Sequence, residues 1–443
     1  MNTKTSSPTS KRNETTTKPV LKKIKTLQGV TEYILPHNGL RVLYVHRPGT
    51  GVVTSNLLYF VGSRDEARGE TGIAHMFEHM LFKPTTLDKA AGLADASCTH
   101  FEREVGCTLN ANTWKDRTTY FFSYPKEHFD RALKIESERM HHTIMEEEEF
   151  APERRNVLSE FDMYAGDEEF SLSVALVNAA FQSHPYGHET IGFREDIETY
   201  TVAKLKRFYA AHYTPENAVL IIVGDVSEVA LKKSVLTHFG ILKKSSTFAP
   251  RETFVEPKQE GLRTVTIERE STKQILALGV KHGGFPSTAW FETMVIFDLL
   301  AGGEDSILHK RLVDAGIAVS VGSILEPTRE TNLGALFITL VKPEHEKVYA
   351  LIQKELAALT AKTVAPYLKK TIAKVLMSEA LERENSMSYV AALVEYTSAG
   401  AWEAFFDSEK ILKAITPAHI IARIHTLFNE RQMTIGYFKG TKK

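Results

Sequence analysis

The chain has 443 residues, 43% of them hydrophobic, which is enough for roughly two to four globular domains with buried cores. Its 54 Lys and Arg residues nearly balance 55 Asp and Glu residues, so the net charge of -1 creates no overall field favouring nucleic acid or an anionic membrane. Two cysteines, Cys98 and Cys107, are too few for a disulfide framework or a four-thiolate zinc site.

The first 25 residues carry the clearest charge asymmetry of the chain. Seven basic residues against Glu14 give this segment a charge of +6, which leaves about -7 for the remainder. The segment is rich in Ser, Thr and Lys, so residues 1–25 are predicted to form a disordered basic tail. It lacks the apolar core of a secretory signal, and no later stretch has the roughly 18 apolar residues of a membrane span. We therefore expect a cytoplasmic protein, with the mitochondrial matrix as the alternative location.

Residues 26–240 are predicted to form a first domain that begins and ends with strands. In chain order, the patterns indicate strands at 40–45 and 52–61, a helix at 72–83, a strand at 118–123, several helices between 126 and 213, and a strand at 217–225. The last of these strands is almost wholly apolar, so both of its faces need to be covered.

Residues 241–262 are predicted to be a linker, because they are poor in apolar residues and contain Pro250, Pro257 and Gly261. The same order of elements then recurs in a second predicted domain, residues 263–443. The patterns indicate strands at 263–269 and 274–281, a helix at 289–300, strands at 317–324 and 333–341, helices between 344 and 428, and a strand at 433–438. This recurrence suggests an internal duplication.

The predicted helix at 72–83 contains the motif His75-x-x-Glu78-His79. At 100° per residue, the three side chains share one arc of about 100° and can converge on one point. Two imidazoles four residues apart suit a tetrahedral zinc ion, and a carboxylate between them can accept a proton from water. This is the inverted zinc-peptidase arrangement. A polar helix edge with no metal is the alternative, so a third ligand is required.

A second helical pattern, which is predicted to begin at Pro152, supplies two candidates for that ligand. Glu153 and Glu160 are seven residues apart and therefore lie about 20° out of register on one helix face. One carboxylate can bind zinc while the other supports the site or positions substrate. Solvated glutamates are the alternative, and the preceding run at 146–149 is better explained that way.

Several segments resemble the inverzincin metallopeptidases of the pitrilysin, insulin-degrading enzyme and mitochondrial processing peptidase group. Residues 72–85 read Gly-Ile-Ala-His-Met-Phe-Glu-His-Met-Leu-Phe-Lys-Pro-Thr, and Glu-x6-Glu follows about 80 residues later. Other segments follow in the family's order: Gly-Cys-Thr-Leu-Asn-Ala-Asn-Thr at 106–113, Pro-Tyr-Gly at 185–187, Ile-Gly at 191–192, and Tyr-Thr-Pro-Glu-Asn-Ala-Val at 213–219. The resemblance covers residues 39–226.

This resemblance implies an α+β fold of two duplicated α/β-roll domains, each a mostly antiparallel sheet covered by helices. It also implies one zinc ion per chain, bound by His75, His79 and Glu160. Such a site keeps a net positive charge, which lowers the pKa of bound water to about 7.

The same resemblance assigns Glu78 as the general base, and Glu153 is expected to assist catalysis from outside the ligand set. Asn110 and Ala111 match an edge-strand segment that holds the substrate backbone. Main-chain hydrogen bonds to such a strand do not depend on substrate sequence. The implied activity is zinc-dependent hydrolysis of peptide bonds in unfolded peptides or protein segments.

The second half departs from the family members that work as single chains. Those members carry an Arg in a Ser-Arg-Leu segment and a Tyr in a Leu-Ala-Tyr-Ser segment, whereas this chain has Ile307 and Val319 at the matching positions. Neither side chain donates a hydrogen bond. We therefore expect a homologous partner subunit that supplies Arg and Tyr, which makes this chain the catalytic half of a heterodimer. A shifted alignment is the alternative, because Arg311 lies four residues after Ile307.

Two other functions remain open at the level of sequence. The chain could be a non-catalytic scaffold or peptide-binding subunit of the same fold, or a subunit that processes mitochondrial presequences. The intact set of His75, Glu78, His79 and Glu160 favours the enzyme, because a scaffold does not need four polar groups directed at one point. No nucleic-acid or membrane partner is expected.

Overall fold

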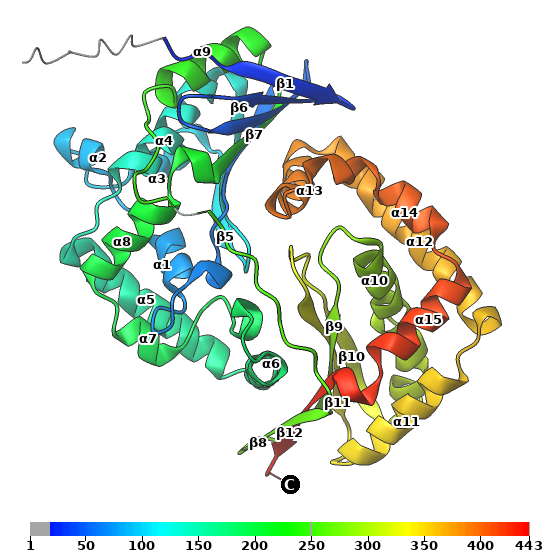
Figure 1. Ribbon diagram of the computed structural model, residues 1–443. Coiled ribbons are helices and arrows are strands. Elements are labelled where there is room, and N and C mark those ends of the chain that lie inside the picture. The colour runs from blue at the N-terminus through cyan, green and yellow to red at the C-terminus, as the bar shows by residue number, and fades with distance from the viewer. Residues whose placement is uncertain (1–17, 249, 443) are drawn as a thin grey trace, which may run out of the picture.

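The computed structural model describes residues 18–248 and 250–442, and these fold into two sheets covered by helices (Figure 1). The predicted fold class is thereby confirmed. The first sheet has seven strands and the second has five. The strands are β1 (Lys22–Leu27), β2 (Val30–Ile34), β3 (Arg41–His46), β4 (Val52–Tyr59), β5 (Thr108–Thr113), β6 (Thr118–Pro125), β7 (Ala218–Gly224), β8 (Arg263–Arg269), β9 (Gln274–His282), β10 (Ala318–Ile324), β11 (Asn332–Leu340) and β12 (Met433–Gly440).

The strand order of the two sheets supports a duplication. In the first sheet β3, β7, β4, β6 and β5 lie side by side, and in the second sheet β8, β12, β9, β11 and β10 follow the same order. The pairs β3–β7 and β8–β12 are parallel, and the other pairs are antiparallel. The hairpin of β1 and β2 extends the first sheet and has no counterpart in the described part of the second.

The helices are distributed between the strands of each half. In the first half they are α1 (Ile73–Met80), α2 (Thr86–Ala90), α3 (Ser97–Val105), α4 (Phe129–His142), α5 (Glu147–Ala165), α6 (Glu168–Ala180), α7 (Arg194–Glu198), α8 (Val202–His212) and α9 (Glu228–His238). In the second half they are α10 (Thr288–Ala301), α11 (His345–Ala358), α12 (Ala361–Glu384), α13 (Ser386–Ser398), α14 (Ser408–Ala414) and α15 (Pro417–Leu427).

The apolar strand β7 is buried on both faces, as its composition predicts. Leu220 and Ile222 point into a core shared with Phe77 of α1 and Leu205 of α8. The alternate residues of β7, among them Ile221, point into a different core. Alternation with a period of two therefore places the metal-site helices on one face of the first sheet.

The other face of each sheet is covered by a helix from the other half of the chain (Figure 1). Helix α13 contacts β4 and β7, and its Leu393 lies in one hydrophobic cluster with Ile221. Reciprocally, α6 contacts β8, β9 and β12, and its Leu176 shares a cluster with Phe337 of β11. Gly279 permits this close approach, since a Cβ atom there would lie only 3.1 Å from Leu176 Cδ2. The two halves thus exchange covering helices.

Two boundaries differ from the sequence-based predictions. The predicted disordered tail, residues 1–25, extends too far, because Lys22 already pairs with Ile34 in the β1–β2 hairpin. Its residues 1–17 lie outside the described residues. The helix predicted to begin at Pro152 begins at Glu147, so Pro152 lies inside α5 and the acidic residues at 147–149 form its first turn. Acidic residues there interact favourably with the helix dipole.

Two further features bear on the sequence-based predictions. Within the described residues, none of the helices is both long and apolar enough to cross a membrane. Cys98 and Cys107 are both buried and are not joined by a disulfide bond.

Candidate metal centre

Helix α1 presents the three polar residues of the motif on the side opposite its apolar residues. Met76, Phe77 and Met80 are fully buried, and the Phe77 ring stacks on Phe208 of α8 with 5.5 Å between centroids. His75, Glu78 and His79 are only partly buried, and α1 also packs against α5 and β5. The amphipathic pattern thus directs the motif toward the elements that carry Glu160 and Asn110.

The start of α1 is held by a close backbone contact between two glycines. A Cβ atom on Gly72, whose φ is +89°, would lie 2.3 Å from the carbonyl oxygen of Ile191. A Cβ atom on Gly192, whose φ is +81°, would lie 2.2 Å from the carbonyl oxygen of Thr71. Only glycine fits at these two positions. This contact explains why the Ile-Gly segment accompanies the metal motif, although about 120 residues separate them.

Substitution of Gly192 is expected to disturb the metal site through this contact. Gly192→Ala is expected to lower the free energy of unfolding by about 1–3 kcal/mol more than Gly69→Ala, because only the former also creates an overlap with backbone. Gly69 is the matched control, since its φ is +78° and nothing lies within 4 Å of an added Cβ. Urea unfolding and zinc affinity of both variants are the measurements. Equal losses in the two variants would contradict a rigid contact at Gly192.

A buried carboxylate caps the same helix end. Glu66 accepts hydrogen bonds from the backbone N–H groups of Gly72 (2.8 Å) and Ala74 (2.9 Å), and its side chain is fully buried. Burial raises the pKa of Glu66 well above its usual range, although these two hydrogen bonds act in the opposite direction. The cap satisfies N–H groups that have no partner within the helix. It fixes α1 immediately before His75.

His75, His79 and Glu160 offer three donor atoms that all lie within 4.8 Å of one another. Glu160 Oε2 is 3.7 Å from His75 Nε2 and 3.5 Å from His79 Nε2. Ligands of a tetrahedral zinc ion at 2.0–2.1 Å lie about 3.3 Å apart, so the observed separations fit such an ion. The two imidazole rings are nearly perpendicular, at 82°. Two nitrogens and one carboxylate oxygen are also a donor set that zinc accepts.

The electrostatics of this cluster favour a cation at its centre. Burial lowers the pKa of His75 to about 4, which leaves this imidazole neutral and able to bind a metal. Burial acts on His79 in the same direction, but hydrogen bonds to Glu153 and Glu160 outweigh it and raise the pKa of His79 to about 9. The surrounding carboxylates therefore stabilise positive charge at the point where the donor atoms meet.

Glu78 lies beside this cluster without contributing one of the three donor atoms. Burial raises the pKa of Glu78, while the nearby polar groups of Thr113 on β5 act in the opposite direction. A carboxyl group with a raised pKa accepts a proton more readily, which suits a general base. Thr113 ends the segment at 106–113 that resembles the family, but nothing in the sequence linked it to Glu78.

Glu153 touches His79 and no other member of the cluster. Its Oε2 lies 3.3 Å from His79 Nδ1 and 3.2 Å from Asn156 Nδ2, and its Oε1 pairs with Lys83. Burial tends to raise the pKa of Glu153, but hydrogen bonds from His79, Lys83 and Asn156 outweigh it and lower this pKa to about 2. The ionised carboxylate orients the His79 ring so that Nε2 faces the other donor atoms. Lys83 was missed from the sequence, although it follows His79 by only four residues, just beyond the end of α1.

Asn110 and Ala111 lie on β5, which is the end strand of the first sheet. Asn110 is exposed, and its side-chain oxygen accepts a 2.8 Å hydrogen bond from the N–H group of Ala111. In the part of the chain that the structure describes, β5 pairs with β6 along one edge and has no strand partner along the other, which can therefore pair with an extended peptide. β5 also packs against α1 and carries Thr113, so this strand lies beside Glu78.

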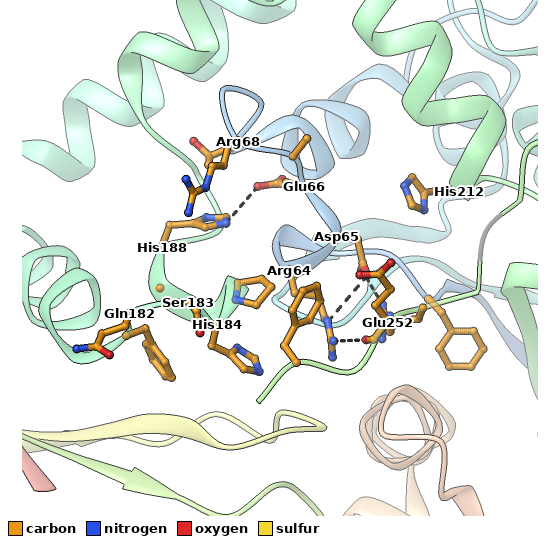
Figure 2. Close-up of a pocket in the computed structure, with 18 of the residues that line it drawn as sticks. Arg64, Asp65, Glu66, Arg68, Gln182, Ser183, His184, His188, His212 and Glu252 are labelled. Carbon is orange, nitrogen blue, oxygen red and sulfur yellow. Dashed lines mark hydrogen bonds and ion pairs between the residues drawn. The ribbon is translucent and has the colours of Figure 1, made fainter. Parts of the chain in front are cut away.

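A separate cavity of about 600 Å³ lies near the linker (Figure 2). It is lined by residues such as Arg64, Glu66 and His188, and by none of the three predicted metal ligands. Some of its charged groups are already paired: Arg64 contacts Asp116 and Glu330 at 3.2 Å each, and Glu66 lies 3.8 Å from His188. The donor set at α1 and α5 therefore identifies the reactive site better than this cavity does.

Comparison with known proteins gives consistent matches over most of the chain. Residues 41–193 match the model of the insulinase family (peptidase family M16), and residues 199–367 match that of the peptidase M16 inactive domain. The zinc protease PqqE of Helicobacter pylori is 34% identical over 335 residues, which cover 75% of this chain and 74% of PqqE. An uncharacterized zinc protease of Mycobacterium leprae is 27% identical over 93% of this chain and 92% of that protein.

Solved structures show the same fold. A protease from Helicobacter pylori matches with a TM-score of 0.84 and 26% identity, covering 95% of this chain and 99% of that chain. The periplasmic protease PqqL from Escherichia coli matches with a TM-score of 0.75 and 18% identity. That match covers 94% of this chain but only 48% of PqqL, so PqqL is about twice as long.

Proposed function

Because the chain belongs to the M16 family of zinc peptidases, we propose that it is an endopeptidase that hydrolyses unfolded peptides as the catalytic subunit of a heterodimer. The observation that carries this proposal is the convergence of His75, His79 and Glu160, with Glu78 beside them. Zinc, the cofactor that the family relationship implies, fits the spacing of these donor atoms.

Different residues of the chain bind the metal, transfer the proton and hold the substrate. A zinc ion held by His75, His79 and Glu160 would polarise the substrate carbonyl group and lower the pKa of water. Glu78 accepts the proton of the attacking water and returns it to the leaving amine, as its raised pKa favours. The peptide adds as a strand to the free edge of β5 at Asn110 and Ala111, so that main-chain hydrogen bonds hold it in register.

The lack of hydrogen-bond donors at two positions in the second half of the chain supports a partner subunit. Ile307 packs against the second hydrophobic core, and Val319 on β10 is 64% exposed, so neither position offers a hydrogen-bond donor from its side chain. Arg311, the alternative arginine, pairs with Glu355 of α11 at 2.9 Å. A structural neighbour about twice as long as this chain shows that the same fold also occurs with additional chain attached. A homologous subunit with Arg and Tyr would complete the site.

Mixing the chain with such a partner is expected to raise turnover of an unstructured fluorogenic peptide by about 10²- to 10³-fold, since this is the usual effect of one oxyanion donor. The chain alone, the partner alone and the mixture are compared at equal zinc concentration. Full turnover by the chain alone would contradict the heterodimer. Bound zinc without turnover in any mixture would instead favour a scaffold or peptide-binding subunit.

A further inference from the structure

The turn that joins β5 to β6 contains four residues that the proposed mechanism does not use. It reads Trp114-Lys115-Asp116-Arg117, and a 2.8 Å hydrogen bond from the N–H group of Trp114 to the carbonyl oxygen of Arg117 closes it. The three charged side chains of the turn are almost completely buried, with exposed fractions of 3–4%. Buried charges require partners, so the contacts of this turn decide how the end of β5 is held.

Lys115 and Asp116 find some of these partners in the second half of the chain. The ammonium group of Lys115 lies 3.8 Å from Glu189 of the first half and 4.0 Å from Glu326, which lies in the connection between β10 and β11. Asp116 accepts a 2.8 Å hydrogen bond from the backbone N–H group of Arg329 in the same connection. Removal of either side chain would leave a buried charge without its partner, so these two contacts belong to the stability of the fold.

Arg117 makes a third connection to the second half, and this one reaches β5 itself. Its guanidinium group pairs with both carboxylate oxygens of Glu395 on α13, with 3.3 Å between Nε and Oε2. The same group donates a hydrogen bond to the side-chain oxygen of Asn112 on β5, and the hydroxyl group of Thr119 on β6 donates a 3.4 Å hydrogen bond to that oxygen. A planar guanidinium that binds two acceptors at once fixes their relative position.

Asn112 lies on the face of β5 that is turned away from the metal-site helix. Its neighbour Ala111 belongs to the first hydrophobic core together with Phe77 of α1. Successive side chains of a strand point to opposite faces, so Asn112 points toward the face of the sheet that α13 covers. Arg117 therefore holds β5 through a side chain on this face, and the contact uses none of the backbone groups with which a peptide would pair.

We propose that Arg117 is a positioning residue for the substrate, which ties β5 to α13 so that the second half of the chain holds the substrate-binding edge in place beside the metal site. This inference rests on the proposed binding of a peptide along β5. A strand at the end of a sheet loses conformational freedom when a peptide pairs with it, and a strand that is already held loses less. The consequence is tighter binding of the peptide with no change in the binding of zinc.

The test is the affinity of the zinc-loaded, full-length chain for a fluorescently labelled unstructured peptide, measured by anisotropy in a Glu78→Gln background that prevents cleavage. Arg117→Met keeps the apolar stem of the side chain but removes both contacts. The peptide dissociation constant is therefore expected to rise about tenfold, while zinc per chain stays the same. Arg423→Met is the matched control, because Arg423 of α15 pairs with Glu292 of α10 at 2.7 Å within the second half. The control is expected to bind the peptide as the background does.

A double-mutant cycle shows whether α13 acts through Arg117. Glu395→Gln alone is expected to weaken peptide binding about fivefold, but less than twofold once Arg117→Met is present, because the two changes break the same contact. Glu395 is 30% exposed, so this variant tests the contact with little effect on folding. Unchanged peptide affinity of either single variant, or an equal loss in Arg423→Met, would overturn the inference while leaving the proposed function intact. A background chain that binds zinc but no peptide would overturn both.

Discussion

Glu78→Gln is expected to reduce peptide turnover by about 10²- to 10⁴-fold while zinc remains bound, because glutamine has nearly the same shape but cannot accept a proton. Glu78 contributes none of the three converging donor atoms, so the metal content should stay at that of the unchanged chain. Turnover of a fluorogenic peptide is measured together with zinc per chain, with the partner subunit present where it is required.

A matched control for this variant is Glu138→Gln on α4. Burial raises the pKa of Glu138 as it does that of Glu78, but Glu138 pairs with Lys134 and belongs to no part of the site. Its replacement should leave turnover within about twofold. If Glu78→Gln retained turnover with zinc bound, Glu78 would not be the general base. If it lost zinc, its role would lie in building the site.

Separating the two halves is expected to prevent either half from folding alone. Without α13, one face of the first sheet would expose apolar residues that now lie in the second core: Val30, Leu43, Val45, Leu58, Val219, Ile221 and Val223. At about 1.5–3 kcal/mol for each buried side chain, their exposure costs on the order of 10 kcal/mol. A typical domain is stable by only about 5–15 kcal/mol. The loss therefore removes most or all of the stability of the first half.

The measurement compares fragments 1–248 and 249–443, produced separately and together, with the full chain. Each fragment alone should be aggregated or lack a cooperative unfolding transition. Production of both together should restore a stable complex, since each fragment supplies the helix that covers the other. A cooperative transition in fragment 1–248 alone, with zinc affinity equal to that of the full chain, would show that α13 is dispensable for the first half.

Much of the architecture follows from short-range patterns. β7 was recognised as an apolar strand and β9 as a strand, and the repeated order of elements indicated a duplication that the strand order of the two sheets supports. β1 was missed because all of its residues are exposed, so no alternation marks it. β5 is also polar and half exposed, and only the family resemblance pointed to it.

The residues of the metal site were likewise predicted from the sequence only in part. His75, Glu78 and His79 share an arc of one helix, and Glu153 shares a helix face with Glu160, so helical periodicity alone grouped them correctly within each helix. Periodicity could not show that Glu153 touches His79 while Glu160 faces both imidazoles. Those contacts join residues more than 70 positions apart, and they depend on how α5 packs against α1.

The sequence by itself determined that β7 requires cover on both faces and that one helix directs three metal-site side chains to one side. Both follow from the local geometry of a strand and a helix, which repeats every two and about 3.6 residues. Only the tertiary structure decided that α13 of the second half covers the first sheet and that α6 of the first half covers the second. It also decided that Gly192 supports the start of α1. Such pairings depend on which apolar faces fit together across the whole chain, and local periodicity contains no information about that fit.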